Sequence, residues 1–222
     1  MVLLALDTAT RTIGLALHDG AQVQAECIWL SHGHHTVELA PEVALMLRRA
    51  GVSPAGLTAV AVSLGPGSFN GLRIGLALAK GLALAHNLPL VGIPTLDVLA
   101  RSQPKREGPM LAVIEAGRGR LAGVWYKSGR SGWQAEGEAE SLTWEEIPGR
   151  LQRVTYICGE IGPEGRQALA GERRAALAPP WMCVRRPSFL AELAWERLRA
   201  GKAADPASLA LIYLRTRIES AP

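Results

Sequence analysis

The segment most suited to binding a phosphate group is Gly65-Pro66-Gly67-Ser68-Phe69-Asn70-Gly71. Glycines let the backbone approach a ligand closely, and free N–H groups at the start of a helix attract anions. The segment matches neither the Walker A pattern nor G-x-G-x-x-G, because no lysine follows in the required place. A second interpretation stays open, in which Ser68 or Asn70 caps the following helix and the glycines only form the turn.

Other side chains that catalyse reactions or bind metals do not form a recognisable set. Ser63 and Ser68 lie near glycines but outside a G-x-S-x-G pattern, so no Ser-His-Asp arrangement is indicated. The histidines of Ser31-His32-Gly33-His34-His35 do not share one helical face at metal-binding spacing, and we expect a solvated polar loop there. The sequence therefore predicts no catalytic residue and no metal site.

The amino-acid composition of the chain is typical of a folded globular protein of the cytoplasm. The chain has 222 residues, of which 48% are hydrophobic, enough for one large or two small cores. Its three cysteines form no Cys-x-x-Cys pair and are interpreted as reduced thiols of a cytoplasmic protein. The net charge of +4 comes from scattered arginines without flanking aromatic residues, so autonomous nucleic-acid binding is not indicated. The longest apolar stretch, Leu72 to Ile93, contains charged residues, and no membrane contact is expected.

The helix expected from Gly71 to His86 carries small residues at every fourth position. Gly71, Gly75, Ala79 and Ala83 would form one narrow ridge, and leucine or isoleucine fills most of the remaining surface. Each glycine inside a helix costs about 1 kcal/mol relative to alanine, which indicates that close packing compensates. We expect one side of this helix to face its own sheet and the other to meet a second helix or chain.

The elements that would position this loop and helix follow a regular order in the first half of the chain. Apolar runs and turn residues predict strands, and apolar residues at helical spacing predict helices. The expected strands are 2–7, 12–18, 22–30, 58–64 and 90–92, and the expected helices are 36–49, 71–86 and 95–101. The order βββαβαβα results, and it opens with an antiparallel meander.

The second half repeats this order without repeating the residues. A polar segment bounded by prolines, 103–109, has the composition of a linker. After it, strands are expected at 110–115, 120–126, 133–140, 154–158 and around Met182, with helices near 144–151, 163–170 and 188–199. The predicted domains are therefore 1–102 and 110–222.

Two copies of this order describe an α/β protein made of two ribonuclease H-like domains, the architecture of the actin-like ATPase superfamily. In such proteins an aspartate at the end of the first strand approaches phosphate and its Mg²⁺, and Asp7-Thr8 occupies that place. The candidate cofactor-binding residues are therefore Asp7, Thr8, Gly65 and Gly67. No cofactor is firmly indicated, and ATP or ADP with Mg²⁺ is the candidate. A plain turn between two strands is the alternative for Asp7-Thr8.

Several runs resemble the bacterial TsaB (YeaZ) family, which is related to TsaD in the actin-like superfamily. They are Ala5-Leu6-Asp7-Thr8-Ala9-Thr10, the run from Ser63 to Gly75, Ala79-Lys80-Gly81-Leu82-Ala83, Gly92-Ile93-Pro94-Thr95-Leu96-Asp97 and Ile212-Tyr213-Leu214-Arg215. The resemblance is specific in the glycine loop and its Leu-Arg-Ile-Gly helix. The first half matches throughout and the second half is divergent.

The resemblance implies a non-catalytic scaffold subunit in the formation of N6-threonylcarbamoyladenosine, next to the anticodon of tRNAs that read ANN codons. It implies that TsaD carries out the transfer, that this chain activates TsaD and helps TsaE to dock, and that tRNA is contacted only indirectly. Partner binding is implied through helices 36–49 and 71–86, with TsaD or, when alone, with a second copy. The side chains expected there are Val37, Leu39, Val43, Leu47, Leu72, Arg73, Gly75, Leu76, Ala79, Lys80 and Ala83.

Two other functions remain open on the sequence. TsaD carries a metal-binding His-x-x-x-His pattern that this chain lacks, so transferase chemistry is not expected here. An ATP-dependent kinase or ATPase using Asp7 and the glycine loop is the main alternative. A peptidase is the third possibility, and no nucleophile-base pair supports it.

Overall fold

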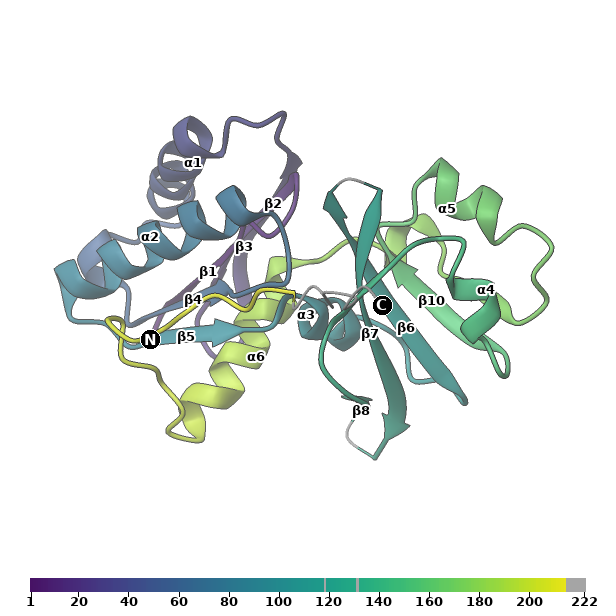
Figure 1. The fold of residues 1–222 in the computed structure, drawn as a ribbon. Coiled ribbons are helices and arrows are strands. Elements are labelled where there is room, and N and C mark those ends of the chain that lie inside the picture. The colour runs from purple at the N-terminus through teal and green to yellow at the C-terminus, as the bar shows by residue number, and fades with distance from the viewer. Residues whose placement is uncertain (118, 131, 215–222) are drawn as a thin grey trace. The chain divides into compact units, whose positions relative to one another are not determined.

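The computed structural model describes residues 1–117, 119–130 and 132–214, so Arg215 of the closing motif lies outside the described residues. The chain divides into two compact units (Figure 1). The first unit consists of Met1–Ser102 together with Arg185–Ile212, and the second is built on Gln103–Val184.

The first unit contains a five-stranded mixed sheet in the order β3-β2-β1-β4-β5. Its strands are β1 (Leu3–Asp7), β2 (Thr12–His18), β3 (Val23–Leu30), β4 (Ala59–Ser63) and β5 (Leu90–Ile93). β1, β2 and β3 pair antiparallel, whereas β1, β4 and β5 run parallel. All residues of β1 and β4 are buried, because helices cover both faces of the central strands. The antiparallel opening and the strand positions predicted for this half are confirmed.

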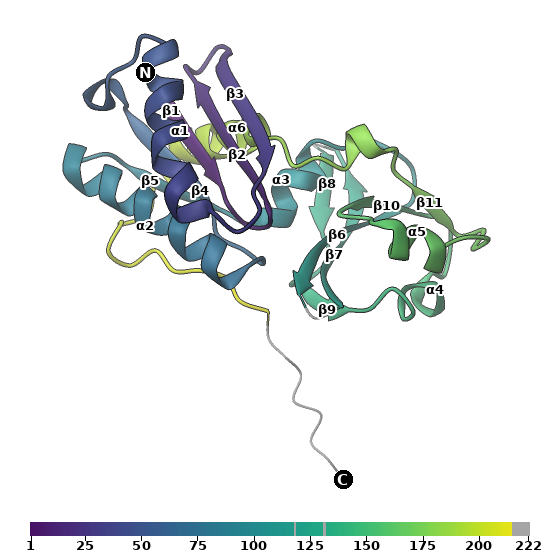
Figure 2. The same cartoon turned by 90° about the horizontal axis from the view of Figure 1, so that it is seen from above.

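Different helices cover the two faces of this sheet, and the apolar clusters beneath them differ in size. α1 (His35–Arg49) and α2 (Phe69–His86) lie on one face, and α3 (Thr95–Arg101) and α6 (Pro187–Arg199) lie on the other (Figures 1 and 2). The face under α1 and α2 carries the larger apolar cluster, with Leu4, Leu6 and Leu15 among its members. The opposite face presents Leu3, Ala5 and Ala16.

α6 corrects the predicted domain boundary. The sequence assigned 188–199 to the second domain, but Leu190, Ala191 and Ala194 are fully buried against the first sheet. The short helix α3 is otherwise the only cover that residues 1–102 supply for this face, so the sheet takes a helix from far along the chain. Helical spacing shows that a helix has an apolar side but cannot show which sheet that side covers.

The second unit contains a mixed sheet in the order β11-β10-β6-β7-β8, and β9 also pairs with β7. Its strands are β6 (Pro109–Gly117), β7 (Arg120–Gly129), β8 (Gly132–Ala135), β9 (Glu140–Leu142), β10 (Thr155–Gly159) and β11 (Ala175–Leu177). Two short helices, α4 (Ile147–Arg150) and α5 (Pro163–Ala168), complete it. The predicted third strand, 133–140, is split into β8 and β9, which both pair with β7.

Two further predictions for this half differ from the structure. The strand predicted around Met182 is wrong, since Pro180–Met182 forms a 3-10 turn and the edge strand lies at Ala175–Leu177. The predicted linker begins with the buried Gln103, whose side chain donates to Met182 O at 2.8 Å and accepts from the Tyr156 hydroxyl at 3.0 Å. Gln103 is therefore part of the second unit. Among the described residues, no helix is long and apolar enough to span a membrane.

Candidate functional site

Asp7 ends β1 with its carboxylate inside the protein. The side chain is 1% exposed, and both of its oxygens have hydrogen-bond donors. Oδ1 accepts from the Ala9 N–H and from the Ser63 hydroxyl, each at 3.0 Å. Oδ2 accepts from Arg185 Nε, also at 3.0 Å. The carboxylate is thus held by the β1–β2 turn, by β4 and by the segment that precedes α6.

Arg185 supplies the positive charge beside Asp7. Its side chain is 2% exposed, and its second amino group donates to Thr10 Oγ1 at 2.8 Å. A buried carboxylate needs a compensating cation, and removing one partner of such a pair costs about 3–5 kcal/mol. Because both Asp7 oxygens are engaged and a guanidinium already provides the charge, these residues do not fit a nucleotide-bound Mg²⁺.

The glycine loop approaches other parts of its own chain. A side chain at Gly67 would place Cβ 2.2 Å from Ala9 O, and the neighbouring Ser68 N–H donates to that same oxygen at 2.6 Å. Gly65 has a φ of +111°, and its Cβ would lie 2.3 Å from Ile212 O. The two glycines therefore serve close contacts between backbone segments. Gly65 N–H is also used internally, since it donates to Thr95 Oγ1 at 3.1 Å.

Ser68 is the residue that caps α2. Its hydroxyl accepts from the Gly71 N–H at 3.3 Å, which satisfies one of the free donors at the start of the helix. The interpretation of the loop as a helix cap and turn is therefore confirmed for Ser68.

Thr8, the last of the predicted cofactor residues, faces α2. It is fully buried, and its Oγ1 has no hydrogen-bond partner among the described residues. A Cβ on Gly75 would lie 2.1 Å from that oxygen, and one on Gly71 would lie 2.3 Å from Thr8 O. An unsatisfied buried hydroxyl costs about 1–3 kcal/mol. Thr8 is covered by the helix, so no surface is left on it for a ligand.

These contacts define the direction in which the small-residue ridge faces. Gly71 and Gly75 allow the β1–β2 turn to pack closely against α2. Ala79 and Ala83 belong to the apolar core between α2 and the sheet. The ridge therefore lies on the side of α2 that faces its own sheet, because the chain's own turn and sheet fill the space beside it. Eight predicted interface residues are buried in the single chain: Leu39, Val43, Leu47, Leu72, Gly75, Leu76, Ala79 and Ala83.

The other three predicted interface residues are at least partly accessible. Val37 is 67% exposed on α1, and Arg73 is exposed on α2, where its guanidinium lies 3.7 Å from the centre of the Phe69 ring. Lys80 is half-buried and donates to Ala207 O at 3.4 Å, so it contacts the segment that follows α6.

The outward side of α2 carries a second small-residue ridge that the sequence analysis missed. Ala77, Gly81 and Ala85 recur at every fourth position and are all exposed. Nothing lies within 4 Å of a Cβ placed on Gly81, so the fold itself gives no reason for a glycine there. Phe69 and Leu84, which are 50% and 69% exposed, add apolar surface along the same helix. The signal was present in the sequence as a further set of small residues two positions from the first.

α1 presents a matching stripe. Val37, Ala40, Pro41 and Ala44 are exposed at positions that share one side of the helix. We call the combined surface the outer helical face; its members are Val37, Ala40, Pro41, Ala44, Phe69, Arg73, Ala77, Gly81, Leu84 and Ala85. α1 and α2 lie on the same face of the first sheet (Figure 1). The outer helical face is therefore an exposed, mostly apolar surface of the first unit.

One histidine of the segment from Ser31 to His35 is part of the folded structure. His35 is buried at the start of α1, and its Nε2 lies 3.0 Å from Thr10 O. His32 and His34 are exposed, as expected for a solvated loop. Among residues 1–117, 119–130 and 132–214, no His, Cys, Asp and Glu side chains form a group that could hold a metal ion.

Comparison with known proteins identifies the relatives of this chain. A family model described as TsaD, tRNA N6-adenosine threonylcarbamoyltransferase, matches residues 30–146, more than half of the chain. The protein named tRNA threonylcarbamoyladenosine biosynthesis protein TsaB from Escherichia coli is 29% identical over 223 residues, covering 98% of this chain and 96% of that protein. TsaB from Bacillus subtilis is 35% identical over 131 residues, covering 58% of this chain and 57% of that protein.

Solved structures agree with the architecture. The structure of YeaZ from Pseudomonas aeruginosa superposes with a TM-score of 0.76 at 23% identity, covering 96% of this chain and 100% of that one. With the two mixed sheets, this similarity confirms the predicted fold class of two ribonuclease H-like domains.

Proposed function

Since the chain belongs to the family of TsaD and its TsaB (YeaZ) relatives, we propose that it takes part in the biosynthesis of threonylcarbamoyladenosine in tRNA. Its role in that process is that of a non-catalytic subunit, which activates TsaD and helps TsaE to dock on the pair. The observation that carries this proposal is the buried Asp7–Arg185 pair. It removes the carboxylate on which a Mg²⁺-nucleotide site at the end of β1 would depend.

The outer helical face is the surface proposed to bind TsaD. Its small residues allow close approach of a partner helix, and Val37, Phe69 and Leu84 provide apolar side chains to bury. A second copy of the chain uses the same surface when TsaD is absent. No observation favours the kinase or peptidase alternatives.

A reconstituted tRNA modification reaction tests the non-catalytic role. Omitting this chain should abolish or strongly reduce threonylcarbamoyladenosine formation by TsaD and TsaE in the presence of a threonylcarbamoyl donor. The double variant Asp7→Asn/Arg185→Met removes both charges of the buried pair at once. We expect it to support modification to within about twofold of the unaltered chain, because the pair stabilises the fold and touches no reactant.

Circular dichroism of the double variant provides the control for folding. A double variant that keeps the unaltered spectrum but loses modification activity contradicts the proposed non-catalytic role.

A further inference from the structure

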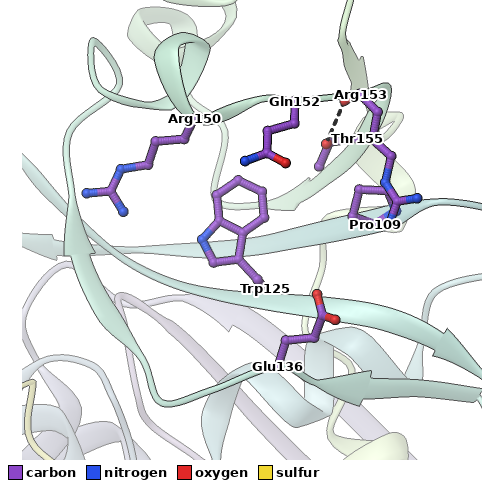
Figure 3. A pocket seen from close by; sticks show the side chains of 7 residues that line it. All are labelled: Pro109, Trp125, Glu136, Arg150, Gln152, Arg153 and Thr155. Atoms are coloured by element: carbon purple, nitrogen blue, oxygen red, sulfur yellow. Dashed lines mark hydrogen bonds between the residues drawn. The ribbon is translucent and has the colours of Figure 1, made fainter.

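The second unit contains a pocket of about 320 Å³ beside β7 (Figure 3). Trp125 projects into it from β7, and Pro109 and Thr155 border it from β6 and β10. The volume lies at the lower end of the roughly 300–1,000 Å³ range of small-ligand sites. Neither the family relationship nor the outer helical face assigns a role to this pocket.

The indole of Trp125 is fixed in orientation. Its N–H donates to Glu140 Oε1 at 2.7 Å, and Arg150 donates to the other oxygen of Glu140 at 2.6 Å. Trp125 also packs against the apolar cluster of this unit, which includes Leu111 directly opposite it on β6. A flat aromatic surface held in this way needs no further ordering when a planar ligand stacks on it.

Three polar side chains around the indole are unpaired within the described parts of the chain. Glu136, Gln152 and Arg153 make no side-chain hydrogen bond or ion pair with the described residues, and all three are exposed. Figure 3 shows Gln152 beside the indole, with Arg153 and Glu136 projecting from neighbouring segments. Together they offer a cation, an amide that both donates and accepts, and an acceptor carboxylate.

We infer that this pocket binds a nucleotide, with the base stacked on Trp125 and the phosphate contacted by Arg153. An aromatic face beside an arginine is the combination that binds unpaired nucleotides, since every base has a π surface and every phosphate a negative charge. Gln152 and Glu136 would contact polar atoms on the edge of the base. A lipid would leave these polar groups unpaired, which is unfavourable. The inference does not rest on the proposed function, because the outer helical face contributes no residue to it.

The same chemistry is offered by a free nucleotide and by a nucleotide within single-stranded RNA. Calorimetric titration of the full chain with AMP tests the first source, and titration with an unstructured seven-nucleotide RNA tests the second. We expect saturable binding of at least one probe, which becomes weaker as the salt concentration rises. Binding of AMP alone, or of RNA alone, supports the inference and identifies the source.

Arg153→Ala is the diagnostic variant, because its exposed side chain contacts no described residue through a hydrogen bond or ion pair whose loss would disturb the fold. We expect it to weaken binding about tenfold, the effect of losing one hydrogen bond to a charged group. Arg166→Ala, which removes an exposed arginine of α5 outside the pocket, is the matched control and should bind like the unaltered chain. Trp125→Phe keeps an aromatic surface and should weaken binding less than Trp125→Ala.

Three results would overturn the inference. The first is the absence of saturable binding for both probes. The second is equal affinity of the unaltered chain and Arg153→Ala. The third is equal weakening by Arg153→Ala and Arg166→Ala, which would indicate a general response to net charge.

Discussion

At the scale of single residues, Asp7 and Arg185 stand 178 positions apart and form an ion pair that is almost completely buried. Desolvating two charges is costly, and their attraction repays this cost only when further hydrogen bonds complete the site. Ser63, Ala9 and Thr10 provide those bonds. The ion pair therefore connects the segment before α6 to the end of β1.

We predict that Arg185→Met lowers the free energy of unfolding by about 3–5 kcal/mol, because it leaves the Asp7 charge buried without a cation. Asp7→Asn combined with Arg185→Met should be less destabilised than Arg185→Met alone, since neither charge then remains. Chemical denaturation of the two single variants and the double variant measures the coupling. Purely additive effects would mean that the two side chains do not interact.

Glu26 makes a second connection to α6, and this one depends on pH. Burial raises the pKa of Glu26, but hydrogen bonds from Arg186 and Ser188 outweigh it and leave the pKa lowered. A lowered pKa contributes stability that is present above the unfolded-state pKa, near 4.5, and is lost as the pH falls through the folded-state value.

We therefore predict that Glu26→Gln reduces stability at pH 7 by about 1 kcal/mol. The difference from the unaltered chain should shrink as the pH falls below about 4.5. Thermal unfolding between pH 3 and pH 7 measures this, and a difference that does not change with pH would contradict the assigned role of the carboxylate.

At the scale of elements, α2 carries small residues on two opposite sides for different reasons. On the inward side, Gly75 makes room for Thr8, and a Cβ there would overlap the threonine hydroxyl. On the outward side, Gly81 has open space around it. Glycine weakens a helix, and nothing around Gly81 in the described fold requires one, which supports the proposal that a partner packs on this side.

We predict opposite effects for the same substitution at these two positions. Gly75→Ala should destabilise the protein by about 1–3 kcal/mol, because the core must shift to accept the methyl group. Gly81→Ala should stabilise it by up to about 1 kcal/mol, because alanine favours the helix and nothing is displaced. Urea denaturation distinguishes the two, and equal effects of both variants would contradict the assignment of inward and outward sides.

At the scale of the full chain, the first sheet is completed by a helix that follows residues 103–184 of the second unit in sequence. Leu3, Ala5 and Ala16 are covered by Leu190, Ala191 and Ala194 of α6. We predict that a fragment of residues 1–102 alone does not fold, whereas the same fragment joined by a flexible linker to residues 185–214 does. Amide proton dispersion in NMR spectra measures both, and a well-dispersed spectrum from 1–102 alone would contradict this dependence.

Local patterns predicted the elements of the first unit well, because buried strands such as Leu3–Asp7 and caps such as Ser68 are encoded by neighbouring residues. They could not predict that α6 belongs to this unit, or that Arg185 reaches Asp7, because both depend on contacts between distant segments. The sequence likewise showed no aromatic residue beside a basic patch. Trp125 and Arg153 meet only when β7 and the connection before β10 come together.

Local sequence patterns also could not show which predicted interface residues are buried within the single chain. A helix that is apolar nearly all round does not reveal which of its sides is covered by its own sheet, so buried residues such as Ala79 were assigned to a partner. A charge at Ala79, which is fully buried, would disrupt the fold and could not test partner binding. Ala77, two positions earlier and exposed, is the informative site.

The most direct test of the outer helical face is therefore sedimentation of the full chain, alone and with TsaD, after the change Ala77→Glu. Ala168→Glu places the same charge on an exposed alanine of α5 and serves as the control. We predict that Ala77→Glu keeps the melting temperature within a few degrees but abolishes both self-association and complex formation with TsaD, and that Ala168→Glu forms both assemblies normally. Undiminished binding of the Ala77→Glu chain to TsaD would contradict the assignment of this face as the functional surface.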